Sequence, residues 1–447
     1  MQRLEHAKIV TMNGSRAVFE EAALVVDAGR IAAIGSTEDL RRAYPQAQAI
    51  DLNQRLVMPG LIDAHNHPFN YLVGGYGDDL PIDDLLYNVF YPYERFVTPD
   101  DAYVGALATY AEMIRSGVTC FNDPGGYMPD MVGAAAQDIG MRGIVNRSTR
   151  DIVPANSLGD TTAEAIRAAV TTVERWNGAA DGRLRAWLGL RTALSASDDL
   201  VREIGDLGRT YKVGVHTHAA ASASEGPASL KKFGKRTFDR YRDLGLMGPN
   251  LYAVHMGFLE DDEIADVAAS GLKIAHCPIA ALAGAWGIVE RGRIPELMEK
   301  GVTVAIGSDT NFGSGTLDMF RQMFVCAVGH RESHANPRLI GADKALAMAT
   351  CDAAKAMMWD DEIGSLEVGK KADLIVVDTR HLEWHYPGRD IARSIVYSGA
   401  RGDVESVMID GQWVMRERKI LTIDEDDLVR RMRKAGAAWK AKADRAA

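Results

Sequence analysis

The sequence feature that most constrains the fold is a repeated alternation of short apolar runs with helix-like segments, beginning near residue 56. Near-continuous apolar strands that alternate with helices are typical of a parallel sheet covered on both faces. Eight such runs occur, at residues 56–64, 118–122, 143–147, 184–190, 213–216, 251–255, 272–276 and 302–307. They predict an α/β fold of the (β/α)8 barrel type. An open doubly wound sheet is the alternative, but no Gly-x-Gly-x-x-Gly motif follows the first run.

Both ends of the chain have a different texture, with short β-prone runs separated by turn residues. In residues 7–57 these runs are interrupted by Asn13-Gly14 and Ala28-Gly29-Arg30, which predict hairpins. The same pattern returns in residues 362–378 and 404–415. Neither end has enough apolar residues to form a core alone, so we expect the two ends to join.

The predicted domain organisation follows from these two sequence patterns. Residues 58–359 are expected to form the barrel, and residues 1–57 and 360–447 are expected to form one small composite β domain beside it. An Ala-rich helix is predicted over residues 341–359, and a charged amphipathic helix over residues 424–442.

Composition excludes several classes of function. The chain of 447 residues has a net charge of -10, whereas nucleic-acid binders usually present a basic surface. Its four cysteines lack paired spacing, so neither a disulfide framework nor a cysteine zinc site is indicated. Residues 1–10 lack the apolar core of a signal peptide, and no apolar stretch reaches membrane-spanning length. We expect a soluble, cytoplasmic protein that acts on a small molecule, without nucleic-acid or membrane partners.

Metal-capable side chains gather where the predicted strands end. His65 and His67 are two residues apart, so they point the same way from an extended chain. Active sites of such barrels lie at the carboxyl ends of the strands. Six of the eleven histidines occupy these ends, together with one aspartate: His65, His67, His216, His218, His255, His276 and Asp309. Scattered surface histidines would not show this placement, so it predicts a functional site.

The residue types also indicate the chemistry of that site. Imidazoles with one carboxylate suit zinc, ferrous iron or cobalt better than calcium or magnesium. Such an ion lowers the pKa of a bound water towards ~7 and makes it a nucleophile at neutral pH. An aspartate beside that water can accept its proton. The pattern therefore predicts metal-assisted hydrolysis.

Several motifs together resemble those of a known superfamily. They are VMPGLIDAHNH at 57–67, GVTCFND at 117–123, AVHM at 253–256, HCP at 276–278, GSD at 307–309 and GSLEVGKKADL at 364–374. Over nearly its whole length the chain resembles the amidohydrolase superfamily, and within it the ATZ/TRZ group of triazine, S-adenosylhomocysteine, cytosine and guanine aminohydrolases. The resemblance implies a distorted (β/α)8 TIM barrel with a composite β-sandwich built from both chain ends.

The resemblance also implies the roles of individual residues. The positions that match the metal ligands of the family are His65, His67, His218 and Asp309. His255 matches the histidine that contacts the substrate or the attacking water, and Asp309 is expected to act as the base. Two-metal members carry a carbamylated lysine after strand four, but residues 184–191 contain no lysine. We therefore expect a single divalent ion, zinc in the first place, with iron, cobalt or manganese as alternatives.

Two further histidines are open to more than one interpretation. His216 points the same way as His218, but only His218 fits the pattern of the superfamily, so we expect His216 to pack or to support a ligand. His276 aligns with the His-x-Pro that follows strand seven. We expect His276 to contact the substrate or to support a ligand, with metal ligation as the alternative.

The chain departs from the superfamily three residues after His218. Deaminases of this group have a glutamate there that transfers protons to the leaving amine, whereas this chain has Ala221. Alanine cannot transfer a proton. Three explanations are open: Glu225 loops back, Asp309 and His255 carry the protons alone, or the leaving group needs no strong acid.

Other residues are expected to line the substrate site, with ordinary loop packing as the alternative. They are Phe69, Tyr71, Tyr127, Trp286 and Asn311. Arg191, at the end of the fourth strand, could hold an anionic group of the substrate or pair with a nearby carboxylate.

The sequence thus predicts a metal-dependent hydrolase that attacks a non-peptide carbon–nitrogen bond, or a related C–X bond, of a small cyclic amide, carbamate or heterocycle. A deaminase that releases ammonia from a purine, pyrimidine or triazine is one alternative. A catalytically silent metal-binding homologue is another, suggested by Ala221. From the habit of the superfamily we also expect a homo-oligomer, a dimer or larger.

Overall fold

A barrel of parallel strands forms the larger part of the molecule. The computed structural model describes residues 1–153, 157–311 and 315–446. Its eight-stranded sheet contains β6 (Leu61–Asp63), β7 (Val118–Asn122), β8 (Arg142–Thr149), β9 (Leu184–Thr192), β10 (Val215–Ala219), β11 (Leu251–His255), β12 (Lys273–His276) and β13 (Thr303–Ile306). Every neighbouring pair is parallel and consecutive in sequence. The predicted barrel is confirmed, and all eight predicted runs contribute a strand.

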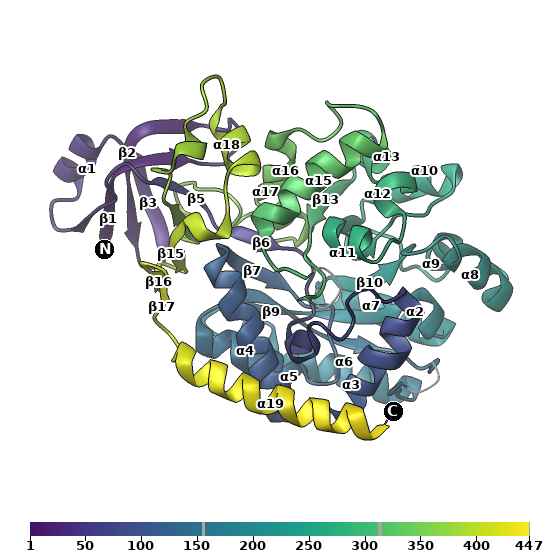
Figure 1. Ribbon diagram of the computed structural model, residues 1–447. Coiled ribbons are helices and arrows are strands. Elements are labelled where there is room, and N and C mark those ends of the chain that lie inside the picture. Colours follow the sequence, from purple (N-terminus) through teal and green to yellow (C-terminus); the bar gives the residue numbers. More distant parts are fainter. Residues whose placement is uncertain (154–156, 312–314, 447) are drawn as a thin grey trace.

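Helices surround this sheet (Figure 1). They are α4 (Pro99–Arg115), α5 (Pro129–Ile139), α6 (Thr162–Trp176), α7 (Asp198–Tyr211), α8 (Glu225–Phe233), α9 (Thr237–Asp243), α10 (Asp261–Ser270), α11 (Pro278–Ala283), α12 (Ile288–Arg291), α13 (Ile294–Glu299) and α15 (Met319–Ser333). Between β6 and α4 lie η1 (Pro68–Val73), α2 (Ile82–Asp84), η2 (Leu85–Phe90) and α3 (Tyr91–Phe96). Thr98 and Thr161 begin α4 and α6 with capping boxes, which satisfy backbone N–H groups at the helix starts.

The two chain ends form one mixed sheet of nine strands, so the predicted composite β domain is confirmed (Figure 1). From the N-terminal side it takes β1 (Gln2–Val10), β2 (Val18–Asp27), β3 (Arg30–Gly35), β4 (Gln48–Asp51) and β5 (Leu56–Pro59). From the C-terminal side it takes β14 (Leu374–Val377), β15 (Val404–Ile409), β16 (Gln412–Arg416) and β17 (Lys419–Ile420). The halves meet where β5 pairs with β1 on one side and β14 on the other.

The predicted first strand, residues 56–64, is divided between the two sheets. β5 belongs to the mixed sheet and β6 to the barrel, and Gly60 lies between them. A Cβ atom at Gly60 would lie 2.0 Å from Oγ1 of Thr119, so only glycine fits at this change of direction. The border expected after residue 57 falls inside β5, and the exact domain limits stay a prediction.

The predicted helix over residues 341–359 is two helices, α16 (Ala342–Met348) and α17 (Cys351–Ala356). The chain leaves helical geometry at Thr350, with φ of -136° and ψ of -100°. The carbonyl of Ala349 accepts a 2.9 Å hydrogen bond from the N–H of Ile62 in β6. The carbonyl group at the interruption between the two helices therefore bonds to strand β6 of the barrel.

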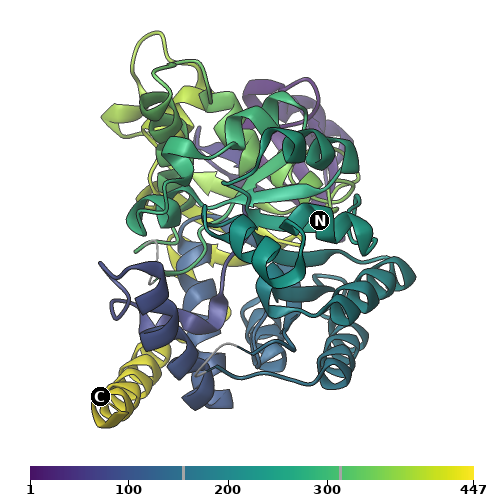
Figure 2. The ribbon, with the colours of Figure 1, turned by 90° about the vertical axis from the view of Figure 1, so that its right-hand side faces the viewer.

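The further helices are α1 (Thr37–Ala43), η3 (Ala193–Ser195), η4 (Leu382–Trp384), α18 (Ile391–Tyr397), η5 (Arg401–Asp403) and the long α19 (Glu425–Ala446). Helix α19, drawn in yellow, runs along the lower margin of the molecule in Figure 1 and lies at the lower left in Figure 2; it contacts α4 and η1. Among the described residues, no helix is both long and apolar enough to cross a membrane.

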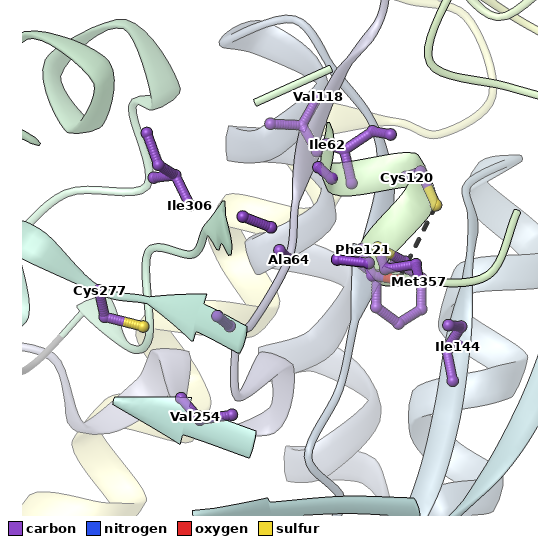
Figure 3. Packing of buried hydrophobic residues seen from close by; sticks show 14 of the residues in the cluster. Ile62, Ala64, Val118, Cys120, Phe121, Ile144, Val254, Cys277, Ile306 and Met357 are labelled. Atoms are coloured by element: carbon purple, nitrogen blue, oxygen red, sulfur yellow. Dashed lines mark hydrogen bonds between the residues drawn. The ribbon is translucent and has the colours of Figure 1, made fainter. Parts of the chain in front are cut away.

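The main hydrophobic core fills the barrel and the space beneath its helices. Figure 3 shows part of this core, with side chains of Ile62, Val118, Ile144, Val254 and Ile306 from five strands.

Candidate metal centre and active site

Hydrogen bonds join the loops after β6 and β13, the first and last strands of the barrel. The N–H of Asp309 donates to the carbonyl of His65 at 2.8 Å, and the N–H of His67 donates to the carbonyl of Asp309 at 2.9 Å. Below them, the carboxylate of Asp63 accepts hydrogen bonds from the backbone N–H and hydroxyl of Ser308. This ladder fixes two imidazoles and one carboxylate side by side, where the barrel closes.

Four potential ligand atoms converge above this ladder. Oδ1 of Asp309 lies 3.6 Å from Nε2 of His65 and 3.7 Å from Nε2 of His67. Nε2 of His67 lies 3.3 Å from Nε2 of His218. Ligand atoms around a tetrahedral zinc ion with bonds of about 2.1 Å are separated by about 3.4 Å. In the described part of the chain, buried Nε2 of His65 has no hydrogen-bond partner, so these residues fit a metal ion.

The opposite nitrogens of the rings hold the ligand atoms in place. Nδ1 of His218 lies 2.8 Å from the carbonyl oxygen of Arg191, so it carries the proton and leaves Nε2 unprotonated. Nδ1 of His65 lies 3.1 Å from Nε2 of His216, whose own Nδ1 lies 3.2 Å from Oδ1 of Asn122. These are the outer contacts that orient metal-binding histidines. Sequence reasoning assigned no role to Asn122, Asp63 or Ser308, although each lies in a quoted motif.

Burial keeps the imidazoles of the site neutral. It lowers the pKa of His65 to about 3 and that of His255 to about 4. It also lowers the pKa values of His67 and His218 well below the usual value, and the nearby charge of Arg191 acts in the same direction. Neutral imidazoles offer lone pairs to a cation at pH 7.

His255 completes the cluster from the end of β11. The ligand-capable atoms of His65, His218 and His255 all lie within 4.8 Å of one another. The ring of Trp286 is perpendicular to that of His255, with their centroids 5.1 Å apart. His255 and Asp309 have φ values of 77° and 68°, which are costly for residues other than glycine. Such strain is characteristic of functional positions.

Comparison with known proteins identifies the family of this site and barrel. The profile described as "Amidohydrolase family" matches residues 56–414, and that of the "Imidazolonepropionase-like composite domain, bacteria" matches residues 22–47. This chain belongs to the amidohydrolase family. It is therefore an amidohydrolase-type hydrolase, and the predicted membership of the superfamily is confirmed.

Curated relatives align with this amidohydrolase over nearly its whole length. The 5-methylthioadenosine/S-adenosylhomocysteine deaminase of Symbiobacterium thermophilum is 34% identical over 98% of this chain and 99% of the relative. The 5'-deoxyadenosine deaminase of Methanobrevibacter smithii is 30% identical over 93% of each chain. These relatives are carbon–nitrogen hydrolases, as expected from the sequence.

Solved structures agree on the fold. An adenosine deaminase from Xanthomonas campestris with bound zinc is 28% identical, covers 98% of both chains and has a TM-score of 0.91. The zinc complex of an atrazine chlorohydrolase from Arthrobacter aurescens is 20% identical, covers 98% of this chain and 100% of the other, and has a TM-score of 0.90. The latter supports the fold alone.

His276 contacts a helix of the amidohydrolase barrel. It is fully buried, and its Nε2 lies 3.0 Å from Nε2 of His330 in α15. Ligand-capable atoms of His276, His330 and Cys326 lie within 4.8 Å of one another. Direct contact between His276 and a substrate stays a prediction.

Three residues expected to line the substrate site make contacts within the fold. Phe69 is 1% exposed and stacks on Tyr93 with centroids 6.0 Å apart. The hydroxyl of Tyr71 donates to Glu112 at 2.8 Å, and Nδ2 of Asn311 donates to the carbonyl of Tyr71 at 3.1 Å. These contacts favour the packing alternative, and substrate contact stays a prediction. Tyr127 instead lies against Arg147, whose guanidinium is 3.8 Å from the centre of its ring.

Glu225 loops back towards the position that lacks the family glutamate. Its Oε2 accepts a 3.4 Å hydrogen bond from the N–H of Ala221, and its Oε1 accepts one of 3.2 Å from the hydroxyl of Thr237. Burial raises the pKa of Glu225, and the hydrogen bonds from Ala220, Ala221 and Thr237 oppose that rise. The structure thus has a carboxyl group beside Ala221, supplied from the start of α8.

Proposed function

We propose that this amidohydrolase hydrolyses a non-peptide carbon–nitrogen bond of a small, cyclic amide, carbamate or heterocyclic substrate, with one zinc ion held by His65, His67, His218 and Asp309. The convergence of these four groups is the observation that carries the proposal. Zinc is the preferred ion because three imidazoles and one carboxylate match its ligand preferences and because the Xanthomonas relative contains it.

When bound, the ion would act as a Lewis acid. It would lower the pKa of a water molecule, so that this water can lose a proton and attack near neutral pH. Asp309 accepts the proton of the attacking water, because its buried carboxylate faces the point where the imidazoles converge. Neutral His255 donates a hydrogen bond to the heteroatom on the electrophilic carbon. Trp286 holds the His255 ring in position and excludes water on one side.

This chain differs from a simple deaminase at the step in which the leaving group is protonated and departs. With Ala221 at the usual position of the glutamate, no side chain there protonates a departing amine. The carboxyl group of Glu225 is already engaged by Ala221 and Thr237. For a cyclic amide, carbamate or substituted heterocycle, we infer that Asp309 returns the proton taken from the attacking water to the departing nitrogen as the carbon–nitrogen bond breaks.

Deamination of a purine, pyrimidine or triazine is the second candidate. It is supported by the names of the curated relatives and of the Xanthomonas structure. An ammonia-release assay over a panel of aminoheterocycles separates the two. Release of ammonia faster than opening of any cyclic amide or carbamate would favour deamination.

The test of the main proposal combines metal content with activity. Zinc removed by a chelator should abolish turnover across the panel, and zinc added back should restore it. Asp309→Ala and His65→Ala should each lower kcat/KM by at least about a thousandfold, because they remove a ligand and, at Asp309, the base.

His381→Ala is the matched control, since this side chain is 54% exposed and lies after β14, outside the strands of the barrel. It should leave both zinc content and turnover unchanged. Near wild-type turnover by Asp309→Ala, or by zinc-depleted protein, would contradict the proposal. Homo-oligomerisation and a cytoplasmic location accompany the proposal, and light scattering on the purified protein tests the first.

A further inference from the structure

Two arginines lie buried at the mouth of the barrel, on the carboxyl ends of neighbouring strands. Arg150 directly follows β8 and is 1% exposed, and Arg191 is the penultimate residue of β9 and is 8% exposed. Charged side chains are rarely buried this far without an opposite charge. Their surroundings therefore bear on what the site binds.

Among the described residues, only one of the two arginines forms an ion pair with a carboxylate. Glu94, which is 4% exposed, forms its ion pair with Nη2 of Arg150. Arg191 makes no ion pair with any described residue, and its guanidinium lies over the ring of Phe90 at 4.6 Å. The buried Nη1 atoms of both arginines lack a hydrogen-bond partner within the described ranges. Arg191 thus lacks the direct ion pair that Arg150 has, because Glu94 and Asp309 act on it only at longer range, and one N–H-bearing nitrogen of each arginine is free.

Arg191 lies close to the proposed metal ligands. Its carbonyl oxygen is 2.8 Å from Nδ1 of His218, and the Phe90 ring beneath its guanidinium is edge-on to His67 at 6.1 Å. An anion bound by Arg191 therefore lies within one small molecule's reach of the converging imidazoles.

Burial of an unpaired guanidinium is expensive unless a ligand supplies the missing negative charge. A guanidinium edge pairs with two oxygens of a carboxylate or phosphate at once. We propose that Arg191, assisted by Arg150, forms a subsite for an oxyacid group of the substrate, a carboxylate or a phosphate, close to the scissile bond. This inference rests on the proposed function and narrows its substrates to anionic ones.

Binding tests the subsite without requiring turnover. Isothermal titration of the zinc-loaded, full-length protein compares benzoate with benzamide, its neutral analogue, and uses phenyl phosphate to distinguish the two oxyacids. Arg191→Met should weaken binding of the preferred anion by about 10- to 100-fold, the effect of losing hydrogen bonds to a charged group, and should change benzamide binding less than about twofold. Arg191→Lys keeps the charge but loses the paired N–H groups, so its affinity for the anion should lie between those of wild type and Arg191→Met.

Arg185→Met is the matched control, because Arg185 lies near the opposite end of the same strand, over Trp359 at 4.1 Å. It should not alter anion binding. The inference is overturned if wild type binds neither anion more tightly than benzamide, or if Arg191→Met and Arg185→Met have equal effects. If Arg191→Met does not fold, the wild-type preference and the Arg191→Lys affinity decide the matter.

Turnover of dihydroorotate and dihydrouracil, which share a ring amide and differ in one carboxylate, provides a second readout. Faster hydrolysis of dihydroorotate that Arg191→Met abolishes would support the subsite. Turnover of neutral rings only, with no anion preference in titration, would overturn the subsite and leave the proposed function standing. Anion binding that depends on Arg191, in a protein without any hydrolytic turnover, would instead refute the proposed function alone.

Discussion

Single side chains behind the metal centre set the orientation of its ligands. His216 lies between Nδ1 of His65 and the amide of Asn122, with contacts of 3.1 and 3.2 Å. His216 is 1% exposed, so its two contacts are shielded from water. Because its contact leaves Nε2 of His65 directed at the metal position, His216 acts as a positioning residue.

Replacement of His216 therefore tests the outer contacts of the site. His216→Ala should weaken zinc affinity by about 10- to 100-fold, as the loss of such contacts usually does. Competition with a fluorescent chelator measures this directly. His216→Gln, which can still hydrogen-bond to Nδ1 of His65, should recover part of the affinity. Equal affinities for wild type and His216→Ala would show that the contact is mere packing.

The buried carboxyl group of Asp123 contributes to the pH dependence of the free energy of unfolding. Burial raises its pKa to about 8, although hydrogen bonds from Gly125 and Asn146 oppose the rise. The unfolded chain loses this proton near pH 4, whereas the folded protein retains it to about pH 8. Its contribution therefore makes the folded state progressively less stable as pH rises through that interval.

Asp123→Asn should remove this penalty. Its side-chain oxygen can still accept the 2.9 Å hydrogen bond from Gly125. Relative to wild type, the free energy of unfolding of the variant should increase between pH 5 and pH 8 by up to about 1.4 kcal/mol per pH unit. Urea denaturation at several pH values measures it, with Asp199→Asn as control, since that side chain is 86% exposed. A pH-independent difference would contradict the buried, protonated state.

At the scale of elements, the C-terminal helix supports the segment that follows the first ligand pair. Trp439 of α19 meets Tyr93 edge to face at 5.1 Å, and the hydroxyl of Tyr93 donates to the carbonyl of Phe69 in η1 at 2.8 Å. Both figures of the whole molecule show α19 against the barrel. The helix that the sequence predicts as charged and amphipathic thus has a buried side, which includes Leu428 and Trp439.

Trp439→Ala should lower the free energy of unfolding by about 3 kcal/mol, the usual range for removing a large buried aromatic side chain. Chemical denaturation measures the loss. Val429→Ala on the same helix is the control, because Val429 is 43% exposed, and it should change stability by less than about 0.5 kcal/mol. If both variants are equally stable, α19 does not brace η1.

At the scale of the whole molecule, one buried ion pair joins the barrel to the mixed sheet. Arg142, the first residue of β8, contacts Asp373 beside β14 through two hydrogen bonds of 2.6 and 3.0 Å. Its guanidinium also lies over Trp359 at 5.4 Å. This contact is at the amino end of the strands, so the mixed sheet covers the end of the barrel opposite the metal centre.

Asp373→Asn should destabilise the protein by up to about 3–5 kcal/mol, because it removes the closer of the two carboxylates that pair with a buried guanidinium and leaves only Asp410, at 3.5 Å. Thermal denaturation of zinc-loaded protein measures this. Asp130→Asn is the control, since its pair with Arg175 is 43% and 56% exposed and exposed pairs contribute about 0–1 kcal/mol. Equal melting temperatures for the two variants would contradict a stabilising role at this junction.

The fold was predictable from sequence because its signals are local and repeated. Each barrel strand is a short apolar run, and each strand end that carries a histidine or Asp309 can be located from the alternation alone. The division of residues 56–64 at Gly60 and the interruption at Thr350 were not predictable, because both depend on partners distant in the chain.

Residue type and strand-end position are properties of the linear chain, so the amino-acid sequence alone specifies which chemical groups lie at the mouth of the (β/α)8 barrel. Tertiary contacts determine which ring nitrogen is free, that His276 contacts His330, and that Arg191 lies over Phe90 without a direct ion pair to any described residue. Those outcomes depend on hydrogen bonds and burial between residues far apart in sequence, and no local pattern encodes them.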